Sequence, residues 1–237
     1  MSASPSTHLL DRPIWSALTT RQQSLAEGSA RARRFPLAIA PFADMADMSD
    51  QSFAALGALL SGSEIAVLFT PEAVTVPPEF KVLLAETGEQ MIGTPADCAP
   101  SGVEIVTLGA ADVPAMMALV ELTKPGPFSL RTHELGTFLG IRVGGELVAM
   151  TGERMKPGNY TEMTAVCVHP DHRGRGYAQA LLSAVGRQIV ARGEIPFLHV
   201  FTSNVSAIAL YRREGYQEVP AFNDEPYAHH WFEKRLG

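Results

Sequence analysis

Two glycines, Gly174 and Gly176, stand between an apolar run that ends at Val168 and a helical pattern that follows. At such a turn, glycines let the oxygens of a ligand approach the backbone, and the unpaired N–H groups of the first helical turn donate hydrogen bonds to them. Arg173 and Arg175 place positive charge beside the glycines, and guanidinium groups bind phosphate strongly. The pattern therefore predicts a phosphate-binding turn.

Two well-known phosphate-binding patterns do not fit this turn. No Gly-Lys-Ser/Thr sequence follows the glycines, and Gln179 stands where a dinucleotide-binding fingerprint requires its third glycine. For this segment alone, an ordinary glycine-rich turn without a ligand remains the alternative.

Two segments of the chain resemble one family. The sequence RGRGYA at residues 173–178, preceded by VHP at residues 168–170, resembles the loop that binds the pyrophosphate of acyl-coenzyme A in the GCN5-related N-acetyltransferases (GNAT). Residues 204–216 resemble the second coenzyme-binding motif of that family, in the matching order and at a matching separation. The resemblance covers about residues 103–237, is closest to the FR47-like branch, and extends poorly to residues 1–100.

The resemblance implies an acyl-CoA N-acyltransferase fold, acetyl-CoA as cosubstrate and a set of coenzyme-binding residues. That set is Val166, Cys167, Val168, Arg173, Gly174, Arg175, Gly176, Tyr177, Ala178, Asn204, Ala207 and Arg212. Backbone N–H groups near residues 166–168, beside a bulge that separates two strands, would stabilise negative charge on the carbonyl oxygen. Asn204 has two compatible roles, because it can cap the helix that it begins and also contact the coenzyme.

Transfer to an amine requires the neutral amine, and a lysine with a pKa of about 10.4 is neutral in only about one molecule in 2,500 at pH 7. The resemblance places Glu162 where the histone-modifying members have a general base, so we expect Glu162 to accept the amine proton directly or through one water. Tyr211 occupies the position of the family's general acid and would protonate the leaving sulfur. The alternatives are a solvated carboxylate at a strand start for Glu162 and a packing role for Tyr211.

The cysteines and histidines offer other chemistry. Cys167 with His169 could form a covalent acyl-cysteine, but Cys167 also reads as a small buried strand residue. The chain has two cysteines, too few for a disulfide framework, and no histidine or cysteine spacing typical of a metal site, so we expect no metal. His199 stands alone in an apolar strand.

The elements that position these residues follow from the pattern of apolar residues and breakers. In the first part we expect a helix over 13–26, a strand over 35–42, a helix over 50–60, and strands over 65–69 and 81–85. In the second part we expect a strand over 103–108, a helix over 110–122, a hairpin of 138–143 and 146–155 around Gly144 and Gly145, a strand over 160–168, a helix over 174–192, a strand over 196–202, a helix over 204–213, and strands over 217–219 and 228–235. This order predicts a mixed α/β sheet.

The 237 residues divide unequally. We expect a disordered N-terminus over 1–11, an N-terminal α/β region over 12–92 that the resemblance allows to be a diverged half-copy of the fold, a linker over 93–102 and a GNAT domain over 103–237. The 46% hydrophobic content excludes a disordered chain. Of the net charge of -6, residues 1–100 carry -5. This balance argues against a general nucleic-acid binder.

The sequence therefore predicts a cytoplasmic acetyltransferase, with no membrane segment, that transfers the acetyl group of acetyl-CoA to a primary amine by direct attack on the thioester. The acceptor is expected to be a small molecule or peptide, and a homodimer is an option. Two alternatives remain open: a non-catalytic acyl-CoA sensor, and an acyltransferase with a longer acyl donor or a glycine-like acceptor. The acidic N-terminal half would suit a cationic acceptor.

Overall fold

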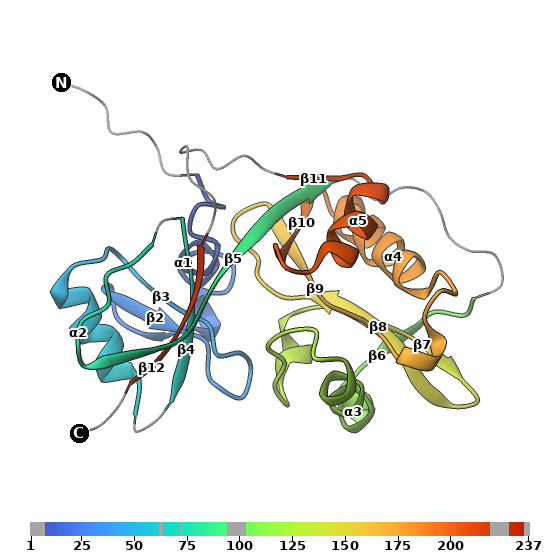
Figure 1. Cartoon of the computed structure of the whole chain (residues 1–237), viewed down its shortest axis with the longest axis horizontal. Helices are drawn as coiled ribbons and strands as arrows, with labels where there is room; N and C mark the ends of the chain where they lie inside the picture. The colour runs from blue at the N-terminus through green and yellow to red at the C-terminus, as the bar shows by residue number, and fades with distance from the viewer. Residues whose placement is uncertain (1–7, 62–63, 72, 94–102, 219–227, 235–237) are drawn as a thin grey trace.

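The computed structural model describes residues 8–61, 64–71, 73–93, 103–218 and 228–234, the last of these as backbone only. Two lobes lie side by side, and one long strand runs between them (Figure 1). None of the described helices is both long enough and apolar enough to cross a membrane.

The first lobe contains a small antiparallel sheet of β1 (Glu27–Gly28), β2 (Ala32–Arg34) and β3 (Ala43–Met45). Helices α1 (Pro13–Thr19) and α2 (Asp50–Leu59) pack against it. Pro13 stands in the first turn of α1, where its missing N–H costs no helical hydrogen bond. Ser49 caps α2 by accepting a hydrogen bond from the Ser52 N–H. These short-range signals explain why both helices begin where the sequence predicts.

The larger sheet runs through both lobes. Its strands are β4 (Ile65–Thr70), β5 (Phe80–Gly93), β6 (Val106–Leu108), β7 (Phe138–Val143), β8 (Glu146–Glu153), β9 (Tyr160–Val168), β10 (Ile195–Phe201), β11 (Tyr216–Glu218) and β12 (Ala228–Lys234). They lie in the order β4-β12-β5-β10-β9-β8-β7-β6, with β11 also paired to β5. The β9–β10 pair is parallel and the other pairs are antiparallel.

Helices cover both faces of the sheet in the second lobe. On one face, Leu181, Leu182 and Val185 of α4 (Tyr177–Ala191) pack against Leu139 and Ile141 of β7. On the other, Met116 and Leu119 of α3 (Val113–Thr123) pack against Phe138, whose side chain lies on the opposite side of β7 from Leu139 because side chains alternate along a strand. Helix α5 (Val205–Arg213) follows β10, and its Ile208 joins the α4 core. The mixed α/β sheet predicted from the sequence is confirmed.

Three predicted segments differ from the structure. The expected helix over 13–26 ends at Thr19, and among residues 20–26 only the short 3-10 helix Gln23–Leu25 is helical. Residues 35–42 form a turn between β2 and β3 in place of a strand, because Pro36 and Pro41 lack the N–H groups that a sheet ladder needs. The expected short strand over 81–85 is the first part of β5, which pairs with β12. The strand continues to Gly93 because its second part pairs with β10 and β11.

Two predicted boundaries fall largely on residues that the structure does not describe. Residues 94–102 of the expected linker and residues 1–7 of the expected disordered N-terminus lie outside the described residues. The prediction of disorder is wrong for residues 8–11, because Leu10 is fully buried and its carbonyl accepts a hydrogen bond from the Gln90 side chain, 3.2 Å away. Leu10 thus anchors this segment to the lobe core.

The two lobes share one hydrophobic core. Phe42 and Val67 of the first lobe pack in the same cluster as Met155 and Phe197 of the second. Polar contacts join them too, since the Gln22 amide donates to the Arg154 carbonyl at 2.8 Å and accepts from the Lys156 N–H at 3.0 Å. The sheet and this core make the described parts of both lobes one packed unit.

Candidate active site

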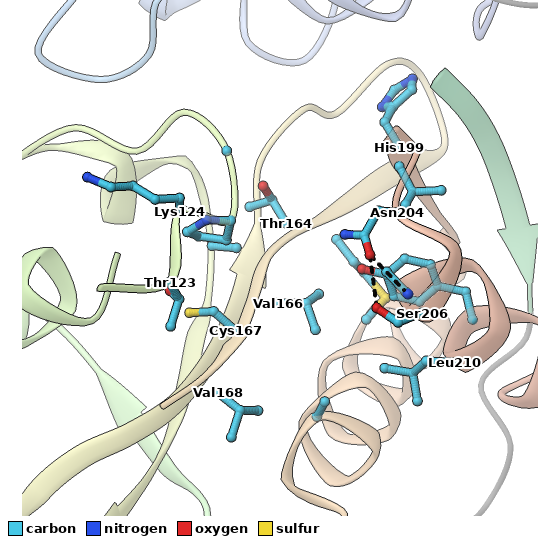
Figure 2. A pocket seen from close by; sticks show the side chains of 18 of the residues that line it. Thr123, Lys124, Thr164, Val166, Cys167, Val168, His199, Asn204, Ser206 and Leu210 are labelled. Atoms are coloured by element: carbon cyan, nitrogen blue, oxygen red, sulfur yellow. Dashed lines mark hydrogen bonds between the residues drawn. The ribbon is translucent and has the colours of Figure 1, made fainter. Parts of the chain in front are cut away.

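Strands β9 and β10 pair only at their first residues and then separate. Their register joins Ile195 to Tyr160, Pro196 to Thr161 and Phe197 to Glu162, and no later pair follows among the described residues. Figure 2 shows the opening that results, with Val166 on one side and Asn204 on the other. The separation frees backbone groups of β9 to face a ligand in place of a neighbouring strand.

A bulge in β9 produces this separation. In the β8–β9 ladder, Met150 pairs with Cys167 and Gly152 pairs with Thr164. Between these pairs, β8 has one residue, Thr151, and β9 has two, Ala165 and Val166. Ala165 takes a φ of 52°, in the left-handed region that residues with a side chain rarely adopt. Such strain commonly marks functional positions, and here it turns β9 away from β10. The bulge lies where the family resemblance leads us to expect one.

The glycine-rich turn after β9 ends at the first residue of α4. Gly174 and Gly176 have φ values of 73° and 77°, and Gly176 caps α4. A Cβ atom at position 174 would meet no atom within 4 Å. Glycine is therefore favoured there because of the positive φ, and not because a side chain would clash. The N–H groups of Tyr177 and Ala178 belong to the first helical turn, which leaves them without helical acceptors. This geometry suits an anion.

Helix α5 closes the other side of the opening. Its first residue follows Asn204, whose Oδ1 accepts hydrogen bonds from the Ala207 N–H at 3.2 Å and the Ser206 hydroxyl at 3.1 Å. The amide nitrogen of Asn204 remains as a donor, and Figure 2 shows it on the side of β9. Asn204 also lines the cavity described next, so the geometry accommodates both roles expected for it.

A cavity of about 920 Å³ joins the turn, the strand opening and the boundary between the lobes. Of the predicted coenzyme-binding residues, ten line it: Val166, Cys167, Val168, Arg173, Gly174, Gly176, Tyr177, Ala178, Asn204 and Ala207. Arg175 and Arg212 are not in its wall. Arg175 is exposed and donates to the Asp171 carbonyl, whereas Arg212 is paired with Glu218 and Glu89. Arg213, the next residue, lines the cavity in place of Arg212.

Tyr211 lines the cavity with 7% of its surface exposed. Burial, with a smaller contribution from Cys167, raises the pKa of Tyr211 to about 12. The phenol therefore keeps its proton at neutral pH and can act as a donor. The role of acid expected for Tyr211 remains a prediction that this geometry supports.

Cys167 is a buried thiol that lines the same cavity. Burial raises its pKa to about 11, so the thiolate, which is the nucleophilic form, is scarce at neutral pH. His169 does not activate it, because its Nδ1 accepts a hydrogen bond from the Asp171 N–H at 3.2 Å and its ring is not in the cavity wall. The geometry gives no support to an acyl-cysteine route.

Glu162 is completely buried and does not line the cavity. The Arg154 guanidinium holds both of its oxygens, with Nε and Nη2 each 2.7 Å from one of them. His199 Nδ1 lies 2.7 Å from Oε1. Burial alone would raise the pKa of Glu162, but Arg154 and His199 outweigh it and lower the pKa to about 2. A carboxylate held in this way is a weak proton acceptor, so the direct role expected for Glu162 has little support from the geometry.

The cavity wall includes residues that were not predicted from the sequence, among them Phe42, Phe69, Arg154 and His199. Arg154 lies over the Phe42 ring at 4.4 Å, and the Phe69 and His199 ring centres are 4.5 Å apart. A single histidine within the apolar strand 195–201 was the visible signal for His199. The others come from distant segments that only the fold brings together. Among the described residues, no group of three histidines, cysteines or carboxylates is arranged to hold a metal ion.

The fold, with its strand opening beside a glycine-rich turn, is of the acyl-CoA N-acyltransferase type. The family model described as FR47-like protein matches residues 138–225. A solved GNAT-family structure from Novosphingobium aromaticivorans is 38% identical and has a TM-score of 0.86, covering 97% of this chain and 100% of its own. The chain therefore belongs to the GNAT family, whose members are acyltransferases.

Two further comparisons extend this result. The N-alpha-acetyltransferase RimI of Mycobacterium tuberculosis is 36% identical over 105 residues, which are 40% of this chain and 63% of the relative. The match thus spans less than two thirds of that curated protein. A GCN5-related N-acetyltransferase from Kribbella flavida has a TM-score of 0.61 at 16% identity, covering 95% of this chain and 96% of its own. That likeness concerns the fold alone.

Proposed function

We propose that this protein is an acetyl-CoA-dependent N-acetyltransferase that acts on a primary amine by direct attack on the thioester. The observation that carries the proposal is the single cavity in which the strand opening of β9 and β10 meets the glycine-rich N-terminus of α4. Its shape and charge suit a long thioester that has phosphates at one end. The name of the mycobacterial relative, an N-alpha-acetyltransferase, supports an amine acceptor.

In this proposal, residues along the cavity bind different parts of acetyl-CoA. The N–H groups of the α4 first turn and Arg173 would hold the pyrophosphate. Arg213, in the same wall, suits a further phosphate better than the predicted Arg212 does. The exposed backbone of β9 around Val166 would pair with the pantetheine amides as a neighbouring strand would.

The bound thioester supplies an activated acetyl group. The reaction forms one C–N bond and breaks one C–S bond, so the amine nitrogen must lose a proton and the departing sulfur must gain one. Tyr211 has the proton and the position for the second task. In this proposal, the backbone N–H groups near residues 166–168 stabilise the carbonyl oxygen while the bonds exchange.

The test is calorimetric titration with acetyl-CoA followed by an assay of coenzyme release against a mixed panel of amines. We expect binding and release with at least one amine. Tyr211→Phe should lower kcat by about 100-fold or more while coenzyme binding stays unchanged, since positioned acids contribute factors of this size. His133→Gln, a histidine outside the cavity wall, is the control.

Other results would select another function. Coenzyme binding without transfer to any amine would support the acyl-CoA sensor, and faster turnover with longer thioesters would identify a different acyl donor. No binding at all would refute the proposal.

A further inference from the structure

We propose that His199 is the group that accepts the proton of the attacking amine, and that Glu162 positions His199 for this task. The inference rests on the proposed function, and it assigns to His199 the role that the sequence suggested for Glu162. It comes from a cluster at the lobe boundary, formed by Arg154, Glu162 and His199.

Of the three residues in this cluster, only one both lines the cavity and can accept a proton. Glu162 is fully buried behind the wall, whereas His199 and Arg154 line it. An arginine guanidinium is always protonated in proteins and cannot serve as a base. His199 is therefore the basic group that the cluster presents to the cavity. Figure 2 shows its ring above Asn204 in this view.

The contact with Glu162 sets the tautomer of His199. Because Arg154 keeps Glu162 ionised, the carboxylate can only accept, and the nitrogen 2.7 Å from it, Nδ1, must be the donor. The neutral imidazole then has its lone pair on Nε2. Burial lowers the pKa of His199 below its ordinary value despite the opposing effect of Glu162, so the neutral ring is present at physiological pH.

The surrounding charges suit a transient imidazolium. Arg154 and Glu162 form a pair without net charge, so a proton on His199 adds one positive charge beside a carboxylate that faces it directly. Two aromatic rings that pack against His199, Phe69 of β4 and Phe197 of β10, are uncharged. The cluster resembles the general arrangement in which a carboxylate orients a histidine and stabilises its protonated form.

The protons balance through this route. As the amine nitrogen forms its bond to the thioester carbon, its proton moves to Nε2 of His199, and the C–S bond breaks with transfer of the Tyr211 proton to sulfur. His199 then releases its proton to solvent and Tyr211 regains one. No oxidant, metal or further reactant is required.

The first test uses four variants in the presence of an amine that the native protein acetylates. We expect His199→Gln to lower kcat by about 100-fold or more and Glu162→Gln by a smaller factor, with acetyl-CoA binding unchanged in both. His133→Gln should match the native rate. His199→Ala should recover part of its activity when imidazole is added, whereas a residue with only a structural role would show no recovery.

The second test needs no turnover. Long-range proton–nitrogen NMR of the ligand-free native protein should show His199 protonated at Nδ1, and Glu162→Gln should change that tautomer population. A ring protonated at Nε2, or a His199→Gln variant within threefold of the native kcat, would overturn this inference and leave the proposed function standing. A native protein that binds acetyl-CoA but acetylates no amine would overturn both.

Discussion

The side chain that most constrains this site is the buried carboxylate of Glu162. Glu162 accepts two hydrogen bonds from the guanidinium of Arg154, whose side chain is only 8% exposed. Removing one partner of a buried ion pair leaves an uncompensated charge, which costs much more than a pair on the surface contributes. Glu162 therefore holds the lobe boundary in place as well as orienting His199.

Glu162 makes the stability of the protein depend on acid. Its pKa falls from 4.5 to about 2 on folding, so its contribution is present above pH 4.5 and is lost as the pH falls towards 2. By linkage this contribution is about 3 kcal/mol. We expect Glu162→Gln to be less stable than the native protein at pH 7 and to lose less stability between pH 5 and pH 2, as measured by urea unfolding. Glu121→Gln, which breaks an exposed pair with Lys124, should show the same dependence of stability on pH as the native protein. If Glu162→Gln loses as much stability as the native protein between pH 5 and pH 2, the lowered pKa of Glu162 is contradicted.

Sequence reasoning at this scale found residues within motifs and missed residues that depend on distant contacts. The short patterns at 173–178 and 204–216 led directly to the turn, Asn204 and Tyr211, since each residue acts close to its own helix end. Arg154 was not predicted because its partner Glu162 lies on the next strand and its stacking partner Phe42 in the other lobe. The coenzyme contact expected for Arg212 stays a prediction; its pairing with Glu218 could not be foreseen, because it depends on where β11 lies.

At the scale of elements, the site depends on one irregularity in β9. The prediction of a strand over 160–168 is confirmed to the residue, and so is the hairpin turn, because Gly144 and Gly145 supply φ values of 59° and 88°. Local signals suffice for such elements. They do not suffice for β5, whose length comes from three partner strands contributed by residues more than 100 positions away.

The strained residue of the bulge offers a direct test of this dependence. Ala165→Val places a β-branched side chain at a φ of 52°, which costs about 1–2 kcal/mol or more unless the backbone moves. We expect the bulge to relax towards a regular strand and acetyl-CoA to bind more weakly, as measured by titration calorimetry. Ala165→Gly tolerates this φ and should bind as the native protein does. Equal affinities in all three proteins would show that the bulge does not shape the coenzyme site.

At the scale of the molecule, the N-terminal half is part of the catalytic fold. Strand β5 from this half lies beside β10, and β12 at the other end of the chain pairs with β4. Phe197 and Met155 are buried in a core that residues of the first lobe complete. The motifs of residues 103–237 therefore cover only part of the unit that folds.

Expression of residues 103–237 alone tests this point. The fragment lacks β5, the antiparallel partner of β10. It also exposes Phe197, Leu135 and Met155, which are each at most 3% exposed in the whole chain. We expect it to aggregate or to unfold without a cooperative transition, and co-expression with residues 1–102 to restore a soluble complex that binds acetyl-CoA. A soluble fragment with a cooperative thermal transition of its own would show that the first lobe is dispensable for folding.

The first lobe also supplies part of the cavity wall, which connects it to the choice of acceptor. The Phe42 and Phe69 rings meet edge to face at 5.4 Å, and Phe69 lies beside His199, the proposed site of amine deprotonation. Phe69 is 8% exposed, so its replacement by leucine keeps most of the apolar volume while removing the ring that faces His199. We expect Phe69→Leu to raise KM for the amine severalfold and to leave the affinity for acetyl-CoA unchanged, because the phosphate-binding turn and the β9 opening lie in the other lobe. Initial rates measured over a matrix of both substrates separate the two constants. A change confined to the acetyl-CoA constant would place the acceptor elsewhere and would leave the first lobe with a structural role only.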